Sequence, residues 1–161
     1  MRRYFGVVCL VVSLILQFGC WNNDQTESSF KKIVISSVDA PAAIGPYSQA
    51  ILVGNTLYCS GQIAFDVKTG ELIQDNIEAE TKQVLSNLGA VLKAAEMDYD
   101  DVVKATVFLQ DLTDYNAVNS VYAEFFGDKP PAREAVEVAR LPRDANVEIS
   151  FIAVRNINWF R

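Results

Sequence analysis

Apolar residues recur along the chain with two different periods, and each period predicts a different kind of element. From Ile77 to Met97 they return every three to four positions, which is typical of a long amphipathic helix lying on a sheet. A second stretch with this spacing follows Asp114, an N-cap candidate, and ends at Gly127, just before Pro130-Pro131. Two helices are therefore expected.

Short runs rich in β-branched and aromatic residues predict six strands. Two of these runs are joined by Gly54-Asn55, the two-residue connection of a tight hairpin. The predicted strands are residues 31–36, 50–53, 56–59, 102–109, 135–141 and 147–154, with a turn at 142–146 before the last.

The order of these elements, βββαβαββ, predicts an α+β fold with one six-stranded sheet and two helices on one of its faces. No element remains to cover the other face. An apolar sheet face does not stay in water, so we expect it to meet a second copy of the protein or another chain, and homo-oligomerisation is the physical expectation.

The first twenty residues have the pattern of an export signal. Arg2-Arg3 precede an apolar run, 5–16, that is shorter than the roughly 20 residues a membrane-spanning helix needs. Gly19-Cys20 resembles the bacterial lipobox, in which the cysteine is lipidated; simple secretion and an uncleaved segment are the alternatives. We expect a signal at 1–20, a polar tether at 21–29, and one folded domain at 30–161. The expected location is the periplasm or, through lipidated Cys20, the membrane surface, with the cytoplasm as the alternative.

The amino-acid composition excludes several classes of catalytic and metal site. The chain has 161 residues, of which 50% are hydrophobic and 21% charged, as in a single packed domain. It has no histidine, which excludes Ser-His-Asp and Cys-His triads and any metal site that needs a histidine ligand. Its three cysteines form no CxxC pair, so neither a zinc knuckle nor a disulfide framework is expected. A net charge of −6 argues against nucleic acid as a partner.

Two charged residues could carry chemistry. Arg133 follows Pro130-Pro131 at a strand start, where it could pair with Glu134 or Glu137, or present a rigidly held guanidinium to a carboxylate. Glu148 lies within a predicted strand, either as a solvated position or as a carboxylate that orients water in a cleft.

Further candidates carry weaker signals. Gly61 follows a buried strand and permits close approach of a ligand, whereas Ser60 beside it lacks an activating histidine. Tyr47 either closes a pocket or fills the core, and the pattern alone favours the core. Asn119 occupies what is usually a solvent-facing helical position. Cys59 is expected to be a small buried hydrophobic residue rather than a nucleophile.

Four segments, 43–50, 60–63, 104–115 and 131–142, together resemble the Rid family (RidA/YjgF) of enamine/imine deaminases. The resemblance runs from about residue 31 to 155. It implies a chorismate-mutase-like fold and a homotrimer with clefts between subunits.

The resemblance also implies an activity, the hydrolysis of 2-iminobutanoate and 2-iminopropanoate to 2-keto acids and ammonia without metal or cofactor. Arg133 matches the arginine that grips the substrate carboxylate, and Glu148 the residue that positions the attacking water. Ala135 stands where many relatives have a cysteine. The remaining residues that the resemblance places at the cleft are Tyr47, Ser60, Gly61 and Asn119.

Two other functions are consistent with the same fold. One is a trimer without catalytic turnover that binds small carboxylates or serves as a regulatory protein. The other is the ribonuclease or translation-inhibitor activity for which some relatives are named, which the negative charge disfavours.

Overall fold

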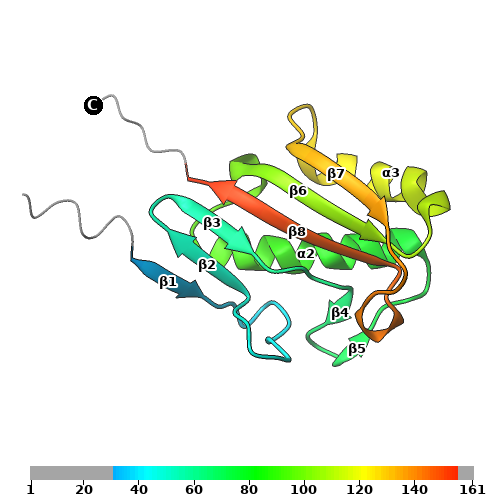
Figure 1. The fold of residues 1–161 in the computed structure, drawn as a ribbon, viewed down its shortest axis with the longest axis horizontal. Coiled ribbons are helices and arrows are strands. Elements are labelled where there is room, and N and C mark those ends of the chain that lie inside the picture. The colour runs from blue at the N-terminus through cyan, green and yellow to red at the C-terminus, as the bar shows by residue number, and fades with distance from the viewer. Residues whose placement is uncertain (1–30, 156–161) are drawn as a thin grey trace, which may run out of the picture. The chain divides into compact units, whose positions relative to one another are not determined.

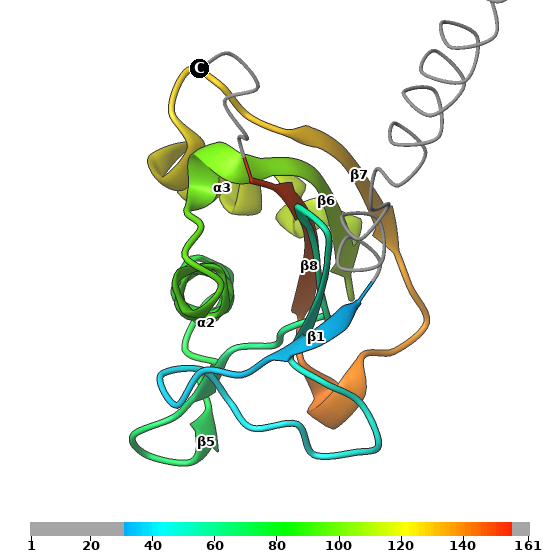
Figure 2. The same cartoon turned by 90° about the vertical axis from the view of Figure 1, so that its left-hand side faces the viewer.

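The computed structural model describes residues 31–155, which form a six-stranded sheet with two helices on one face (Figures 1 and 2). The strand order is β1-β2-β3-β8-β6-β7, and every neighbouring pair is antiparallel except β6 and β7. The strands are β1 Lys32–Ile35, β2 Ala50–Val53, β3 Thr56–Cys59, β6 Val102–Leu109, β7 Ala132–Glu137 and β8 Val147–Val154; the helices are α2 Ile77–Ala94 and α3 Tyr115–Phe126. The predicted α+β fold class is confirmed.

The predicted hairpin and both predicted helices are present. Val53 pairs with Thr56 across the turn, and Gly54 adopts a φ of 61°, a left-handed conformation that suits glycine. Helix α2 begins after Asn76, whose side chain accepts a hydrogen bond from the Ala79 amide at 2.8 Å. Gly127, with φ 52°, follows the end of α3 as expected.

The core lies between the helices and the sheet. Alternate residues of β8, including Ile149 and Phe151, face the helices and are buried, as are Leu85, Leu88 and Leu92 of α2. The intervening residues of β8, among them Glu148, are only half-buried because they point to the other face. The strand periodicity therefore decides which side chains remain available for a site.

Two details differ from the sequence prediction. Strand β7 covers Ala132–Glu137 rather than 135–141, because its parallel ladder with β6 begins at Lys104 and stops at Leu109, where β6 itself ends. A second, two-stranded sheet formed by β4 Phe65–Asp66 and β5 Glu71–Leu72 was not predicted. Three short 3₁₀ helices also occur, at Tyr99–Asp101, Leu112–Asp114 and Pro142–Asp144.

In Figure 2, both described helices lie on the same side of the sheet. Apolar side chains on the other face are exposed in the described chain. Val34, Tyr58 and Val136 are 60%, 50% and 44% exposed, and they lie on β1, β3 and β7. The predicted signal (1–20) and tether (21–29) lie outside the described residues. Within residues 31–155, no helix is long and apolar enough to cross a membrane.

Candidate functional site

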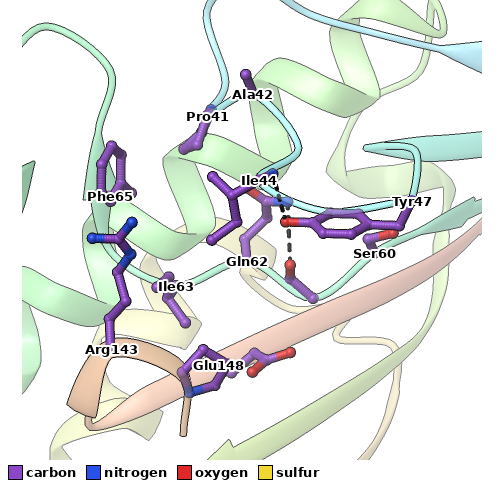
Figure 3. Close-up of a pocket in the computed structure, with 12 residues that line it drawn as sticks. Pro41, Ala42, Ile44, Tyr47, Ser60, Gln62, Ile63, Phe65, Arg143 and Glu148 are labelled. Atoms are coloured by element: carbon purple, nitrogen blue, oxygen red, sulfur yellow. Dashed lines mark hydrogen bonds between the residues drawn. The ribbon is translucent and has the colours of Figure 1, made fainter. Parts of the chain in front are cut away.

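Four of the predicted site residues line one pocket, here called the glutamate pocket (Figure 3). It has a volume of about 450 Å³ and lies between the loop that precedes β2, the segment after β3, and the start of β8. These four residues are Tyr47, Ser60, Gly61 and Glu148.

Glu148 extends over the backbone of Gly61. A Cβ atom at position 61 would lie 2.8 Å from Cδ of Glu148, closer than such atoms approach in proteins. Glycine at position 61 therefore allows the Glu148 carboxylate to lie here, in the space that the sequence analysis had assigned to close approach of a ligand. Burial raises the pKa of Glu148, so its carboxylate holds a proton more readily than an exposed glutamate does.

Tyr47 lies at the pocket surface and not in the core, so the prediction from the pattern alone was wrong. Its side chain is 49% exposed, and its hydroxyl accepts a hydrogen bond from the Ile44 amide at 3.3 Å. The loop is fixed by buried Gln49, whose amide nitrogen donates to three backbone carbonyls, the shortest bond being 2.7 Å to Pro41. Ser60 adds a bond of 2.7 Å from its hydroxyl to the Ser48 carbonyl. In the described chain, Ser60 thus contributes to positioning the loop that carries Tyr47.

The start of β8 is held by a carboxylate that sequence reasoning missed. Glu80 of α2 is fully buried and accepts hydrogen bonds from the Asn146 backbone amide at 2.7 Å and from its side-chain amide at 2.8 Å. Since Asn146 precedes Glu148 by two residues, this contact fixes where β8 enters the pocket. Glu80 lies on the buried face of a predicted helix, where a glutamate is rare, and this position could have indicated the contact from the sequence.

Arg133 and Asn119 line a second cavity of about 430 Å³, here called the arginine pocket. One terminal nitrogen of Arg133, Nη2, donates to Oδ1 of Asn119 at 2.5 Å and to the hydroxyl of Tyr115 at 3.2 Å. The guanidinium carbon lies 4.7 Å from the centroid of the Tyr122 ring, a cation–π contact. Helix α3 therefore fixes the orientation of this arginine.

In the described part of the chain, Arg133 forms no ion pair with Glu134 or Glu137. Glu134 instead bonds Lys104 and Thr106, and Glu137 accepts from the Leu112 amide at 2.9 Å. Within residues 31–155, the Nε and Nη1 atoms of Arg133 have no hydrogen-bond partner, so both nitrogens keep N–H donors that can bind an anion.

Tyr115 and Tyr122 belong to the same pocket and were missed. Tyr115, Asn119 and Tyr122 lie at positions i, i+4 and i+7 of α3 and therefore on one face of the helix. This spacing could have predicted that the two tyrosines lie in the same pocket as Asn119. The hydrogen bond from Arg133 lowers the pKa of Tyr115, whereas burial raises that of Tyr122 to about 12. The Tyr122 hydroxyl is buried and has no hydrogen-bond partner in the described part of the chain.

The two pockets do not meet within one chain. Arg133 pairs with Ala105, which is buried beneath the helices, so its side chain lies on the helix-covered face of the sheet. Glu148 pairs with Phe108, and both point to the open face. The structure thus brings together Tyr47, Ser60, Gly61 and Glu148, and separately Asn119 and Arg133.

Cys59 is buried, as predicted, and burial raises its pKa to about 12, which leaves it protonated at neutral pH. Within residues 31–155, no three histidine, cysteine, aspartate or glutamate side chains gather as a metal site would require.

The chain is similar to known proteins along most of its described length. The family model described as endoribonuclease L-PSP matches residues 37–155. A 2-iminobutanoate/2-iminopropanoate deaminase from Capra hircus is 51% identical over 128 residues, covering 80% of this chain and 93% of that protein. A RutC family protein from Pyrococcus horikoshii is 52% identical over 124 residues, covering 77% and 98%. The crystal structure of the E. coli YjgF gene product has a TM-score of 0.74 at 46% identity, covering 77% of this chain and 99% of that one. The chain therefore belongs to the endoribonuclease L-PSP family, the RidA/YjgF family that its motifs resemble.

Proposed function

We propose that this protein hydrolyses 2-iminobutanoate and 2-iminopropanoate to the corresponding 2-keto acids and ammonia. The observation that carries the proposal is the Arg133 fork, which helix α3 orients while two of its donor nitrogens stay free for a carboxylate. The relatives at about 50% identity that are named as deaminases of these two imino acids support the same activity.

In this proposal Arg133 binds the substrate carboxylate through charge-assisted hydrogen bonds from its free donors, which fix the position of the imine carbon. Lysine would supply the charge without the planar fork. Asn119 and Tyr115 hold the guanidinium from the side opposite to the substrate.

Glu148 acts on water in the same proposal. Starting from the protonated imine, its carboxylate takes a proton from a water molecule as the water oxygen bonds to the imine carbon, which gives a neutral carbinolamine. Glu148 then returns this proton to the amine nitrogen. As the C–N bond breaks and ammonia leaves, Glu148 takes the proton of the hydroxyl group, the oxygen becomes the keto group, and Glu148 releases that proton to solvent. The carboxylate must be ionised to begin this cycle. Tyr47 and Gly61 shape the wall of the cleft beside it.

The reaction needs Arg133 and Glu148 in one cleft, and a single chain separates them across the sheet. We therefore propose a homotrimer in which the arginine pocket of one subunit closes the glutamate pocket of its neighbour. The apolar open face supports this assembly, because exposed side chains such as Val34, Tyr58 and Val136 favour burial against another copy.

Release of ammonia from an imino acid that is generated in situ tests the activity, measured above the spontaneous rate. A non-catalytic carboxylate-binding trimer would bind the keto acid without raising that rate. A ribonuclease, the activity in the name of the family model, would instead cleave RNA; the negative net charge speaks against it.

For the first residues of the chain we propose export, followed by lipidation at Cys20. The support is the sequence pattern alone: an apolar run after two arginines that ends in Gly19-Cys20. Simple secretion and a cytoplasmic protein with an uncleaved N-terminus are the alternatives.

A further inference from the structure

An arginine that the proposed chemistry does not use lines the glutamate pocket. Arg143 lies in the Pro142–Asp144 turn before β8, with its guanidinium carbon 5.7 Å from the centroid of the Phe65 ring. Figure 3 shows Arg143 and Phe65 at one end of the pocket and Tyr47 and Ser60 at the other. The pocket thus has a positive charge at the end remote from Tyr47.

The guanidinium of Arg143 has no acidic partner in the described range, 31–155. Its neighbour Asp144 is already engaged, because Nε of Arg140 donates to Oδ1 of Asp144 at 2.7 Å. Arg143 is therefore free to bind an anion in the pocket.

The backbone at Arg143 is strained. Its φ of 57° and ψ of 25° lie in the left-handed region, which glycine adopts at far lower cost. The turn is held there by Gln74, whose side-chain amide donates to the Asp144 carbonyl at 2.7 Å. An arginine where glycine would be more stable points to a role for the side chain itself.

In a single chain the glutamate pocket extends from Tyr47 to Arg143 and has a volume of about 450 Å³. Its middle is lined by apolar side chains, among them Ile44 and Ile63, which suit methylene groups. The pocket thus fits a substrate with an apolar middle and an anionic end.

We propose that Arg143 is a specificity-determining residue that binds the second carboxylate of dicarboxylic 2-imino acids, such as 2-iminosuccinate and 2-iminoglutarate. The inference rests on the proposed deaminase function, with Arg133 of a neighbouring subunit binding the first carboxylate. Arg143 lies away from the imine carbon, so the hydrolytic step is the same for short and long substrates.

The test compares 2-iminoglutarate with 2-iminobutanoate, each formed in situ by an amino-acid oxidase and corrected for spontaneous hydrolysis. Arg143→Gln should lower kcat/KM about tenfold for 2-iminoglutarate and leave 2-iminobutanoate unchanged. Arg143→Lys, which retains the charge, should keep part of the preference. Lys82→Gln, an equal charge change at an exposed position of α2, should alter neither rate. Arg143→Gly should lose the same preference while melting at a higher temperature, because it relieves the backbone strain.

Equal rate losses on both substrates, or a change in oligomeric state by light scattering, would overturn the inference by making Arg143 a structural or subunit-contact residue. So would wild-type protein that hydrolyses 2-iminobutanoate but not 2-iminoglutarate, and in that case the proposed deaminase function would stand. If wild-type protein hydrolyses neither, the proposed function fails and this inference with it.

Discussion

Arg133 and Glu148 project from opposite faces of the same sheet, on strands β7 and β8, which are separated by β6. Each lies in its own pocket, with Asn119 beside the arginine and Tyr47 beside the glutamate. A reaction that uses both residues therefore needs two chains.

Arg133→Lys should lower kcat/KM by about a hundredfold or more, because lysine keeps the charge but not the fork. Each charge-assisted hydrogen bond lost is worth roughly 1.5–3 kcal/mol. Steady-state ammonia release measures the effect, and circular dichroism controls for folding. Near-normal turnover in this variant would remove Arg133 from the site.

Glu148→Gln should lower kcat while leaving KM nearly unchanged, because glutamine keeps the shape but cannot accept a proton from water. The raised pKa of Glu148 adds a pH signature. As the pH falls, Glu148 is protonated earlier than an exposed glutamate, so activity should be lost at a higher pH than the ordinary pKa of a glutamate would give. The kcat profile from pH 4 to 8 tests this. An acid limb that persists in Glu148→Gln would contradict the assignment.

Gly61→Ala should reduce kcat by displacing the Glu148 carboxylate, with little loss of thermal stability, because the group that must move is the end of a flexible side chain. The double variant Gly61→Ala/Glu148→Gln should have the same kcat as Glu148→Gln alone, since both changes act on one carboxylate. Additive losses in this double-mutant cycle would mean that Gly61 affects the reaction by another route.

Glu80→Gln should destabilise the fold by about 1–3 kcal/mol, because glutamine has one acceptor oxygen for the two donors of Asn146. Urea unfolding measures the change. Glu78→Gln, at an exposed position of the same helix, is the matched control and should shift the midpoint little. Equal midpoints for the two variants would contradict the role given to Glu80.

Cys20→Ser tests the export proposal. The full-length product should partition into detergent, whereas the variant should not, because a lipid on the cysteine holds the protein at the membrane. Full-length protein found entirely in the cytosol with Met1 intact would contradict export.

Sequence patterns predicted most of the fold because turns and helices depend on interactions between residues that are close in the chain. The Gly54-Asn55 turn and the periodicity of α2 depend on residues close in sequence, and both are present. Strand β7 was misplaced because its limits are set by its ladder with β6, which no single segment reveals. The β4–β5 pair was missed because strands of two residues have no measurable period.

The site was predictable only in part for a related reason. The sequence motifs identified Arg133 and Glu148 as candidate site residues. They could not show that Arg133 would contact α3 rather than Glu134 or Glu137. Arg143 gave no signal at all in the sequence, since its backbone conformation and its place in the pocket depend on tertiary contacts.

Mixing two inactive variants tests the shared site most directly. Chains with Arg133→Ala and chains with Glu148→Ala, co-expressed in equal amounts, form trimers in which some clefts combine an intact Arg133 with an intact Glu148. Random assembly should restore about a quarter of the wild-type rate per chain, while each variant alone stays inactive. Mixed trimers without restored activity would contradict a site built from two subunits.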